Sequence, residues 1–321
     1  MVREEGKVLY AELPENLRQV IITGHGSLST DALVLLSTYG VDLILIDWKG
    51  KVVSRLSAPE MRTVFTRREQ YIAYKDSRSG YLAKAFVLAK MKNQKALLGT
   101  FAKNRKETDS AAAERITHFK NVIEDLITRL EAFEPASIDT SRPSILGFEG
   151  SASSTYWDGI KEVVPEELKF DERSGRGALD PFNSMLNYGY GVLEGETWRA
   201  VHYAGLDPYG GFLHADRPGK PSMVLDLMEE FRQQLVDRTV ISLASKKVVT
   251  SKDFQIEEGF CRLSDEARRA LLKELLGKME EYLAVGEEKM RWCDLILSKS
   301  RDVAQYLRGE VNNYNGFYLR W

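Results

Sequence analysis

The residues best suited to chemistry are gathered in one stretch of the chain, residues 205–237. A glycine-rich turn leads to His214, and the following helix, predicted from the spacing of its apolar positions, carries Asp226 and Glu229. Their separation of three residues places both carboxylates on one side of that helix. Charged groups within an apolar stripe are costly unless they are paired or bound to a metal. The stretch therefore predicts either an ion pair with Arg232 beside a structural histidine, or a divalent-metal site that needs a third ligand from elsewhere.

Another carboxylate with unusual surroundings is Glu149, which lies in the apolar, glycine-flanked segment 145–150. The small residues that follow predict a helix packed closely against another element. Taken alone, Glu149 is also compatible with a carboxylate near a helix N-terminus, where the helix dipole favours negative charge. Farther along, the polar loop 169–180 carries Arg173 and Arg176 and is the best local candidate for a segment that contacts phosphate.

The pattern of apolar residues changes along the chain, and its two parts together predict an α+β protein. The first sixty or so residues are rich in β-branched and apolar residues, which favours strands with one short helix at 30–39. Helical periodicity dominates after a transition between 59 and 76. We therefore predict a β-rich N-terminal dimerisation domain (1–70), a linker (71–79) and a larger all-α catalytic domain (80–321).

The composition indicates which class of protein this chain belongs to. Of 321 residues, 43% are hydrophobic and 29% charged, which is typical of a globular chain. No apolar run is long enough to span a bilayer, and the N-terminus lacks the apolar core of a signal peptide. Cys261 and Cys293 lie outside any CxxC motif or Cys/His cluster, so we expect a reduced, cytoplasmic setting. The formal net charge of −2 neither indicates nor excludes a nucleic-acid partner.

One motif points to a different chemistry but is incomplete. Gly24 and Gly26 follow a predicted strand and precede a helix, and Asp47 ends the next strand, as in half of a dinucleotide-binding fingerprint. Ser29 stands where the third glycine belongs, and the chain continues through a hairpin turn at Lys49 instead of further βα units. We therefore favour a simple turn over a nucleotide-cofactor site.

Taken together, several stretches resemble a known family, the CRISPR-associated endonuclease that integrates new spacers into the CRISPR array. The matching pieces occur in the family's order and spacing and cover nearly the whole chain: GHGSLSTDALVLLSTYGVDLILID, LGFEGSASSTYW, DPFNSMLNYGYGVL, GLDPYGGFLHADRPGKPSMVLDLMEEFR and the VDR that follows. The resemblance implies an N-terminal β-domain joined to a larger all-helical domain. This agrees with the change from strand-like to helical patterns between residues 59 and 76. It also implies insertion of short DNA fragments by attack of a 3′-hydroxyl on a phosphodiester.

The same resemblance implies a set of metal ligands, which falls here on Glu149, His214 and Glu229. Two carboxylates and one imidazole suit Mg²⁺ or Mn²⁺, with positions left open for water and phosphate oxygens. Asp226 matches a second acidic position close to the site. The sequence leaves open whether Asp226 is an outer-shell group or an alternative ligand.

The implied partners are double-stranded DNA, a second copy of the chain, and a small ferredoxin-like protein of the same CRISPR system. The candidate DNA-contacting residues are Arg62, Arg67, Arg68, Arg142, Arg173, Arg176, Tyr156 and Tyr188. For each arginine the alternative is a solvated surface, and for each tyrosine a packing role. A non-catalytic DNA-binding protein of the same fold is the alternative function.

The N-terminal strands separately predict a surface for self-association. The apolar content of segments 18–24 and 41–47 exceeds what one short helix buries, and exposed edge strands need cover. In a homo-oligomer the simplest cover is the same surface of a second copy. We therefore expect a two-fold homodimer formed mainly through residues 1–75, with the two helical domains held apart.

Overall fold

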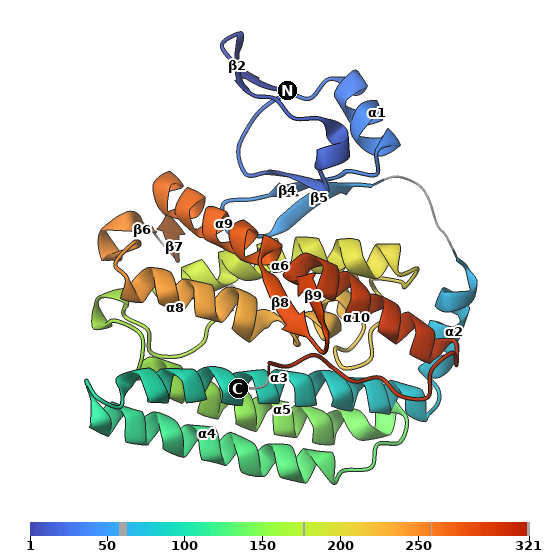
Figure 1. Ribbon diagram of the computed structural model, residues 1–321, viewed down its shortest axis with the longest axis vertical. Helices are drawn as coiled ribbons and strands as arrows, with labels where there is room; N and C mark the ends of the chain where they lie inside the picture. Colours follow the sequence, from blue (N-terminus) through green and yellow to red (C-terminus); the bar gives the residue numbers. More distant parts are fainter. Residues whose placement is uncertain (58–62, 176, 258, 320–321) are drawn as a thin grey trace.

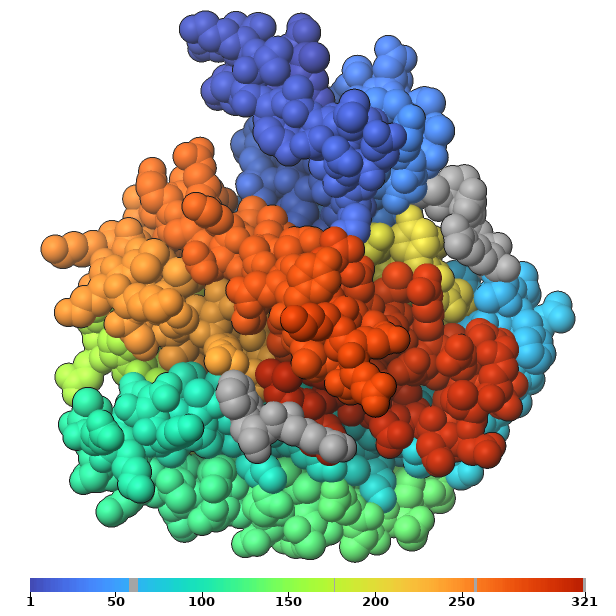
Figure 2. Space-filling model, viewed as in Figure 1, coloured from blue at the N-terminus to red at the C-terminus, as the bar shows by residue number. Residues whose placement is uncertain are grey.

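The protein divides into a small N-terminal part that contains strands and a larger helical part (Figure 1). The computed structural model describes residues 1–57, 63–175, 177–257 and 259–319. Figure 2 shows the N-terminal part standing out from one end of the helical body. The predicted α+β fold class is confirmed.

The N-terminal part contains a hairpin and a mixed sheet. Its elements are β1 (Val2–Glu4), β2 (Lys7–Tyr10), β3 (Gln19–Ile22), α1 (Thr30–Thr38), β4 (Asp42–Ile46) and β5 (Val52–Leu56). In the sheet β4 is central, parallel to β3 and antiparallel to β5. The side chains of β4 are the most buried of the sheet, as its unbroken apolar run predicts.

Local sequence signals set the ends of α1. The Ser29 hydroxyl accepts a hydrogen bond from the backbone N–H of Ala32 (3.2 Å) and caps the start of the helix. Gly40 follows the helix with φ of 64°, a conformation that glycine adopts without strain. Gly24 and Gly26 lie before this helix in open surroundings, since a Cβ added at either would meet no described atom within 4 Å. Neither glycine makes the close approach that a dinucleotide fingerprint requires.

The helical part is built around α3, the longest of its described helices. Its elements are α2 (Phe65–Ala73), α3 (Ser77–Arg105), α4 (Ser110–Glu131), α5 (Ile138–Lys161), α6 (Pro181–Tyr203), α7 (Ser222–Met228), a π-helical segment η3 (Arg232–Asp237), α8 (Arg238–Ser245), β6 (Phe254–Glu257), β7 (Phe260–Leu263), α9 (Asp265–Glu280), β8 (Tyr282–Val285), β9 (Glu288–Arg291) and α10 (Trp292–Leu307). Residues 71–79 comprise the end of α2, a turn and the start of α3. Within the described residues, no helix is both long and apolar enough to cross a membrane.

The helices form two layers that share α3 (Figure 1). On one side α3 packs with α4 and α5, and on the other it contacts α7 and η3, which in turn pack on α6. Because α3 is covered on both sides, some of its polar residues are buried together with its apolar ones. They are Ser79, Lys90, Asn93 and Gln94.

The start of α5 differs from the loop that its local sequence predicts. The prolines at 135 and 143 favour a loop, yet the helix begins at Ile138. The Ile138 N–H donates to Ser79 Oγ and the Ala136 N–H to Ser141 Oγ, both at 2.9 Å, so the helix start is anchored to α3. Pro143 lies near that start and removes a single internal hydrogen bond. As a result Glu149 lies in the middle of α5 and not at its N-terminus.

Glycines on α6 allow the N-terminal part to pack closely on the helical part. A Cβ added at Gly191 would lie 1.5 Å from the Gly50 carbonyl oxygen, and one added at Gly195 would lie 2.9 Å from Ile44 Cδ1. Gly50 itself has φ of 83° in the turn between β4 and β5. The glycine-containing face of α6 is therefore the surface on which the β4–β5 hairpin rests.

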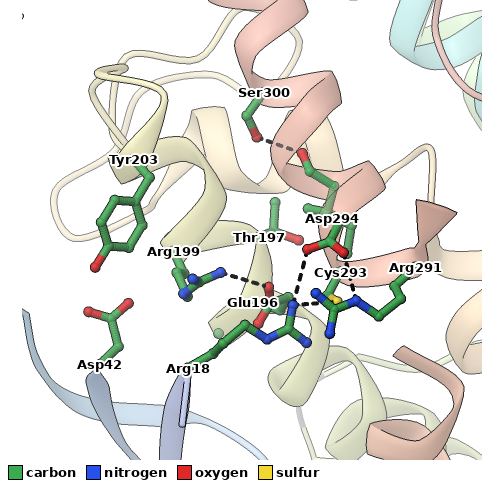
Figure 3. A network of polar contacts seen from close by, with 12 residues as sticks. Arg18, Asp42, Glu196, Thr197, Arg199, Tyr203, Arg291, Cys293, Asp294 and Ser300 are labelled. Carbon is green, nitrogen blue, oxygen red and sulfur yellow. Dashed lines mark hydrogen bonds and ion pairs between the residues drawn. The ribbon is translucent and has the colours of Figure 1, made fainter. Parts of the chain in front are cut away.

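A polar network next to this contact also joins the two parts (Figure 3). Arg18, just before β3, contacts Glu280 and lies 3.2 Å from Asp294. Arg291 contacts the same two carboxylates at 3.1 and 2.7 Å, and Arg18 also donates to Cys293 Sγ. The network fixes the N-terminal part against α9 and α10 by charge, in addition to the apolar contact on α6.

Candidate active site

The loop that carries His214 is held from three sides. Gln70 of α2 donates to the carbonyls of Asp207 (3.0 Å) and Gly210 (2.7 Å). Arg142 of α5 donates to the carbonyl of Phe212 at 3.0 Å. A Cβ at Gly211 would lie 2.5 Å from the backbone of the first residue of α7, so only glycine lets the loop lie on that helix. These contacts leave the His214 side chain 25% exposed at the mouth of the site.

Asp226 fixes the orientation of the His214 ring. Its fully buried carboxylate accepts the backbone N–H groups of Phe212 (2.6 Å), Leu213 (2.9 Å) and His214 (2.9 Å). The same carboxylate lies 2.7 Å from His214 Nδ1. An ionised carboxylate only accepts, so Nδ1 carries the proton and the lone pair of the imidazole is left on Nε2. Asp226 is saturated by these contacts, and we therefore infer that it positions His214 and is not itself a ligand.

Glu149 and Glu229 approach each other from α5 and the end of α7. Both carboxylates contact the ammonium of Lys90 on α3, which lies 2.7 Å from Glu229 Oε2. Ser153 donates to Glu149 Oε1 (2.9 Å), one helical turn away on α5. His214 Nε2 lies 4.0 Å from Glu229 Oε1. The structure thus brings the three expected ligands to one place, together with a lysine that the sequence did not single out.

A second cation also lies at Glu229. Arg232 Nε is 3.2 Å from Glu229 Oε1, and the guanidinium stacks over the Tyr190 ring at 4.7 Å. The predicted Glu–Arg pair is therefore present alongside the candidate ligand set. Burial alone would raise the pKa of Glu229, but the charges of Arg232 and Lys90 outweigh it and lower that pKa to about 2. Glu229 is consequently ionised at any pH at which the protein would work.

Arg232 begins the π-helical segment that follows Glu229. A π-helical turn is wider than an α-helical one and is often found at functional sites. Here it separates the short α7 from α8.

The donor set fits a divalent cation, although it is not preassembled. Within the described residues, no three His, Cys, Asp or Glu side chains have the arrangement of a ready metal-binding cluster. The Lys90 ammonium contacts both of the carboxylates that would hold such an ion. Glu229 Oε2 is buried, and the Lys90 ammonium lies 2.7 Å from it. This carboxylate, a second carboxylate and an imidazole Nε2 are suitable donors for Mg²⁺ or Mn²⁺.

Two of the candidate DNA-contacting arginines are engaged inside the protein. Arg142 supports the His214 loop, as described above, and also donates to Tyr74 Oη. Arg173 donates to the side chains of Asn183 (3.0 Å) and Asn187 (2.7 Å) on α6. Both arginines therefore have structural partners that account for their positions.

The other candidates differ in accessibility. Arg68 is exposed and Arg67 half-buried on α2, whereas Arg62 and Arg176 lie outside the described residues. Tyr156 is fully buried and donates to Asp237 (2.8 Å), and Tyr188 is 1% exposed. Their positions fit the packing role that was the alternative for each tyrosine.

Lys90 could have been found from the sequence by its place in the repeat of α3. It lies four residues after Phe86 and four before Gln94, on the stripe that the helix buries. A lysine on such a stripe needs a buried anionic partner.

Glu230, next to the site, has a different role and holds the C-terminal segment in place. Its carboxylate accepts hydrogen bonds from the Tyr314 hydroxyl and from the Phe317 N–H (2.7 Å). A Cβ at Gly316 would lie 2.7 Å from Ala89 Cβ, so the segment lies tightly on α3. Burial raises the pKa of Glu230 to about 7, against the opposing effect of these two donors.

We expect Glu230→Gln to change the pH dependence of stability. Because the folded-state pKa is above the unfolded value of 4.5, the stabilisation is complete below pH 4.5 and is lost as pH rises through 7. The shift corresponds to about 3 kcal/mol. The neutral amide lacks this dependence, so the stability of wild type relative to the variant should fall between pH 5 and 8. Urea unfolding across that range measures it, and parallel pH curves would contradict the assignment.

The profile of the family described as CRISPR associated protein Cas1 matches residues 1–276. The chain belongs to the Cas1 family. A relative from Archaeoglobus fulgidus, named CRISPR-associated endonuclease Cas1 1, is 44% identical over 327 residues, which cover 100% of this chain and 94% of the relative. The resemblance inferred from the sequence is thus confirmed.

Solved structures agree with this Cas1 assignment. A casposase bound to integration product has a TM-score of 0.80 and 31% identity, covering 92% of this chain and 80% of its own. A CAS1 protein from Thermotoga maritima has a TM-score of 0.75 at 21% identity, covering 92% and 88%, and shows the shared fold. The Cas1 chain therefore belongs among the CRISPR-associated endonucleases and is related to integrases.

Proposed function

We propose that this Cas1 chain uses Mg²⁺ or Mn²⁺ to insert short DNA fragments into a CRISPR array by attack of a 3′-hydroxyl on a phosphodiester. The observation that carries the proposal is that Glu149 and Glu229 converge on Lys90, with His214 Nε2 4.0 Å from Glu229 Oε1. The casposase of similar structure was solved bound to integration product. Integration is the class of reaction that we propose for this chain.

Each residue of the site has a part in the proposed reaction. Glu149, Glu229 and His214 Nε2 would hold the ion. When bound, a divalent ion supplies Lewis acidity at the phosphate and favours the deprotonated form of the attacking hydroxyl. Asp226 keeps the proton of the imidazole on Nδ1, so that Nε2 is ready to ligate. Arg232 fixes the position of Glu229.

An integration assay tests the function directly. A short duplex with free 3′-hydroxyls is incubated with a supercoiled plasmid that carries a CRISPR array, with Mn²⁺, and with or without the small partner protein. Joined products are expected with wild type and are expected to be lost in Glu149→Gln. Glu124→Gln on α4 is the matched control, because Glu124 pairs with Lys95 in a solvent-facing contact. DNA binding without any joined product from wild type would favour the non-catalytic alternative.

The proposed partners are double-stranded DNA, the small ferredoxin-like CRISPR protein and a second copy of the chain, in the cytoplasm. Among the DNA-contact candidates, Arg68 of α2 has the most accessible described side chain. Phosphate contacts of this kind supply affinity without base specificity.

We expect the homodimer to form through the N-terminal part. The exposed fraction is 65% for Val34 on α1 and 62% for Val53 on edge strand β5, and none of the residues of α1 is buried within one copy. Val53→Asp should shift the solution mass from dimer to monomer, because a charge would be buried in an apolar interface. Val248→Asp, at an equally exposed position of the helical part, is the control. A Val53→Asp variant that stays dimeric under sedimentation would place the interface elsewhere.

A further inference from the structure

Lys90 is the feature of the site that the ligand set leaves unexplained. Its side chain is 11% exposed, and its ammonium contacts both Glu149 and Glu229. Burying an ammonium is costly unless its partners compensate for the lost hydration. Here the partners are the same two carboxylates that would hold a divalent ion. The ammonium and the ion therefore compete for one position.

The charges around the site show what this competition would do. Among the side chains joined by these contacts, two are cations, Lys90 and Arg232, and three are carboxylates, Glu149, Asp226 and Glu229, so with a neutral imidazole they sum to one net negative charge. A divalent ion would change that to one net positive charge. A single phosphodiester would then bring the site to neutrality. The charge of these residues would thus favour a phosphodiester more with the ion bound than without it.

The two cations differ in their freedom to move. Arg232 is stacked on Tyr190 and paired with Glu229 Oε1, and its planar guanidinium is fixed by both contacts. Lys90 is paired through its ammonium, at the end of a flexible four-carbon stem. Rotation of that stem can move the ammonium without a movement of α3. Lys90 is thus the cation that an incoming ion would displace.

We propose that Lys90 is a built-in counter-ion, which a divalent cation displaces from Glu149 and Glu229, and that the released ammonium then binds a phosphate oxygen of the DNA. The proposal rests on the metal site of the proposed function. It makes Lys90 a positioning residue that couples loading of the ion to binding of DNA. Without the ion, Lys90 keeps two close carboxylates from repelling each other.

Calorimetric titration with Mn²⁺ tests the competition. Lys90→Met is expected to bind Mn²⁺ tighter than wild type by roughly tenfold or more, since removing a unit charge a few ångströms away changes the binding energy by more than the 1.4 kcal/mol of a tenfold step. Lys92→Met is the matched control, because Lys92 lies on the same helix but pairs with Glu131 (2.6 Å) on α4. Lys90→Gln, which keeps a polar group in place, serves if the methionine variant does not fold.

The outcomes separate this inference from the proposed function. Unchanged or weaker Mn²⁺ binding by both Lys90 variants would overturn the counter-ion role while leaving the metal site intact, provided that Glu149→Gln abolishes the wild-type binding. A wild type that binds no Mn²⁺ would overturn both.

A second readout tests the released ammonium. DNA with 3′-dideoxy ends binds without reacting, so its affinity can be measured by fluorescence anisotropy with and without Mn²⁺. We expect Mn²⁺ to increase the DNA affinity of wild type, and the increase to be several-fold smaller in Lys90→Met. An equal increase in both proteins would show that the ammonium does not reach the phosphate.

Discussion

Replacing His214 with alanine is expected to abolish strand transfer while leaving folding and DNA binding nearly unchanged. Even the loss of an outer-shell partner of a metal ligand costs about 10- to 100-fold, so loss of the ligand itself should reduce the rate by about a thousandfold or more. DNA affinity comes mainly from phosphate contacts, to which one neutral imidazole adds little. Joined product in the plasmid assay and anisotropy of labelled duplex measure the two effects.

The control for this variant is His118→Ala, since His118 is exposed on α4, which carries none of the site residues. It should retain both activities. Equal losses of DNA binding and strand transfer in His214→Ala would instead assign a structural role to the histidine and would remove it from the ligand set.

Asp226→Asn is expected to reduce both stability and strand transfer. The carboxylate accepts three backbone N–H groups as well as His214 Nδ1, and an amide NH₂ in place of Oδ1 would face two of these donors. Leaving two buried N–H groups without acceptors costs roughly 2–6 kcal/mol. The imidazole would also lose the partner that keeps its lone pair on Nε2, for a further loss in rate of about 10- to 100-fold.

Thermal unfolding and Mn²⁺ titration of Asp226→Asn separate the two effects. Asp125→Asn, at an exposed position on α4, controls for the change of charge. If Asp226→Asn keeps wild-type metal affinity and strand transfer at a temperature at which it is fully folded, Asp226 does not orient His214.

Much of the fold follows from local sequence signals. The strands β3 and β4 are formed by runs of β-branched residues, and α1 lies between a serine cap and Gly40. The three-residue spacing of Asp226 and Glu229 correctly placed both on the side of the helix that faces His214. These features depend on a few neighbouring residues, which is why the sequence alone indicates them.

The remaining features depend on contacts between distant segments. The roles of Asp226 and Glu229 differ because the His214 loop surrounds one carboxylate with N–H donors and leaves the other facing Lys90. Helix α5 extends past Pro143 because Ser79 of α3 anchors its start. Nothing in the local pattern around Lys90 names Glu149, 59 residues away, as its partner. Such pairings are decided by packing of α3 against α5 and α7.

A crystal structure with Mn²⁺ bound, recorded to give anomalous scattering from manganese, tests the metal site most directly. We predict one anomalous peak in contact with Glu149, Glu229 and His214 Nε2, with metal–oxygen distances of about 2.0–2.6 Å. The Lys90 ammonium should have moved away from both carboxylates in the same map. Manganese bound elsewhere, or Lys90 still between Glu149 and Glu229 at saturating Mn²⁺, would contradict the account.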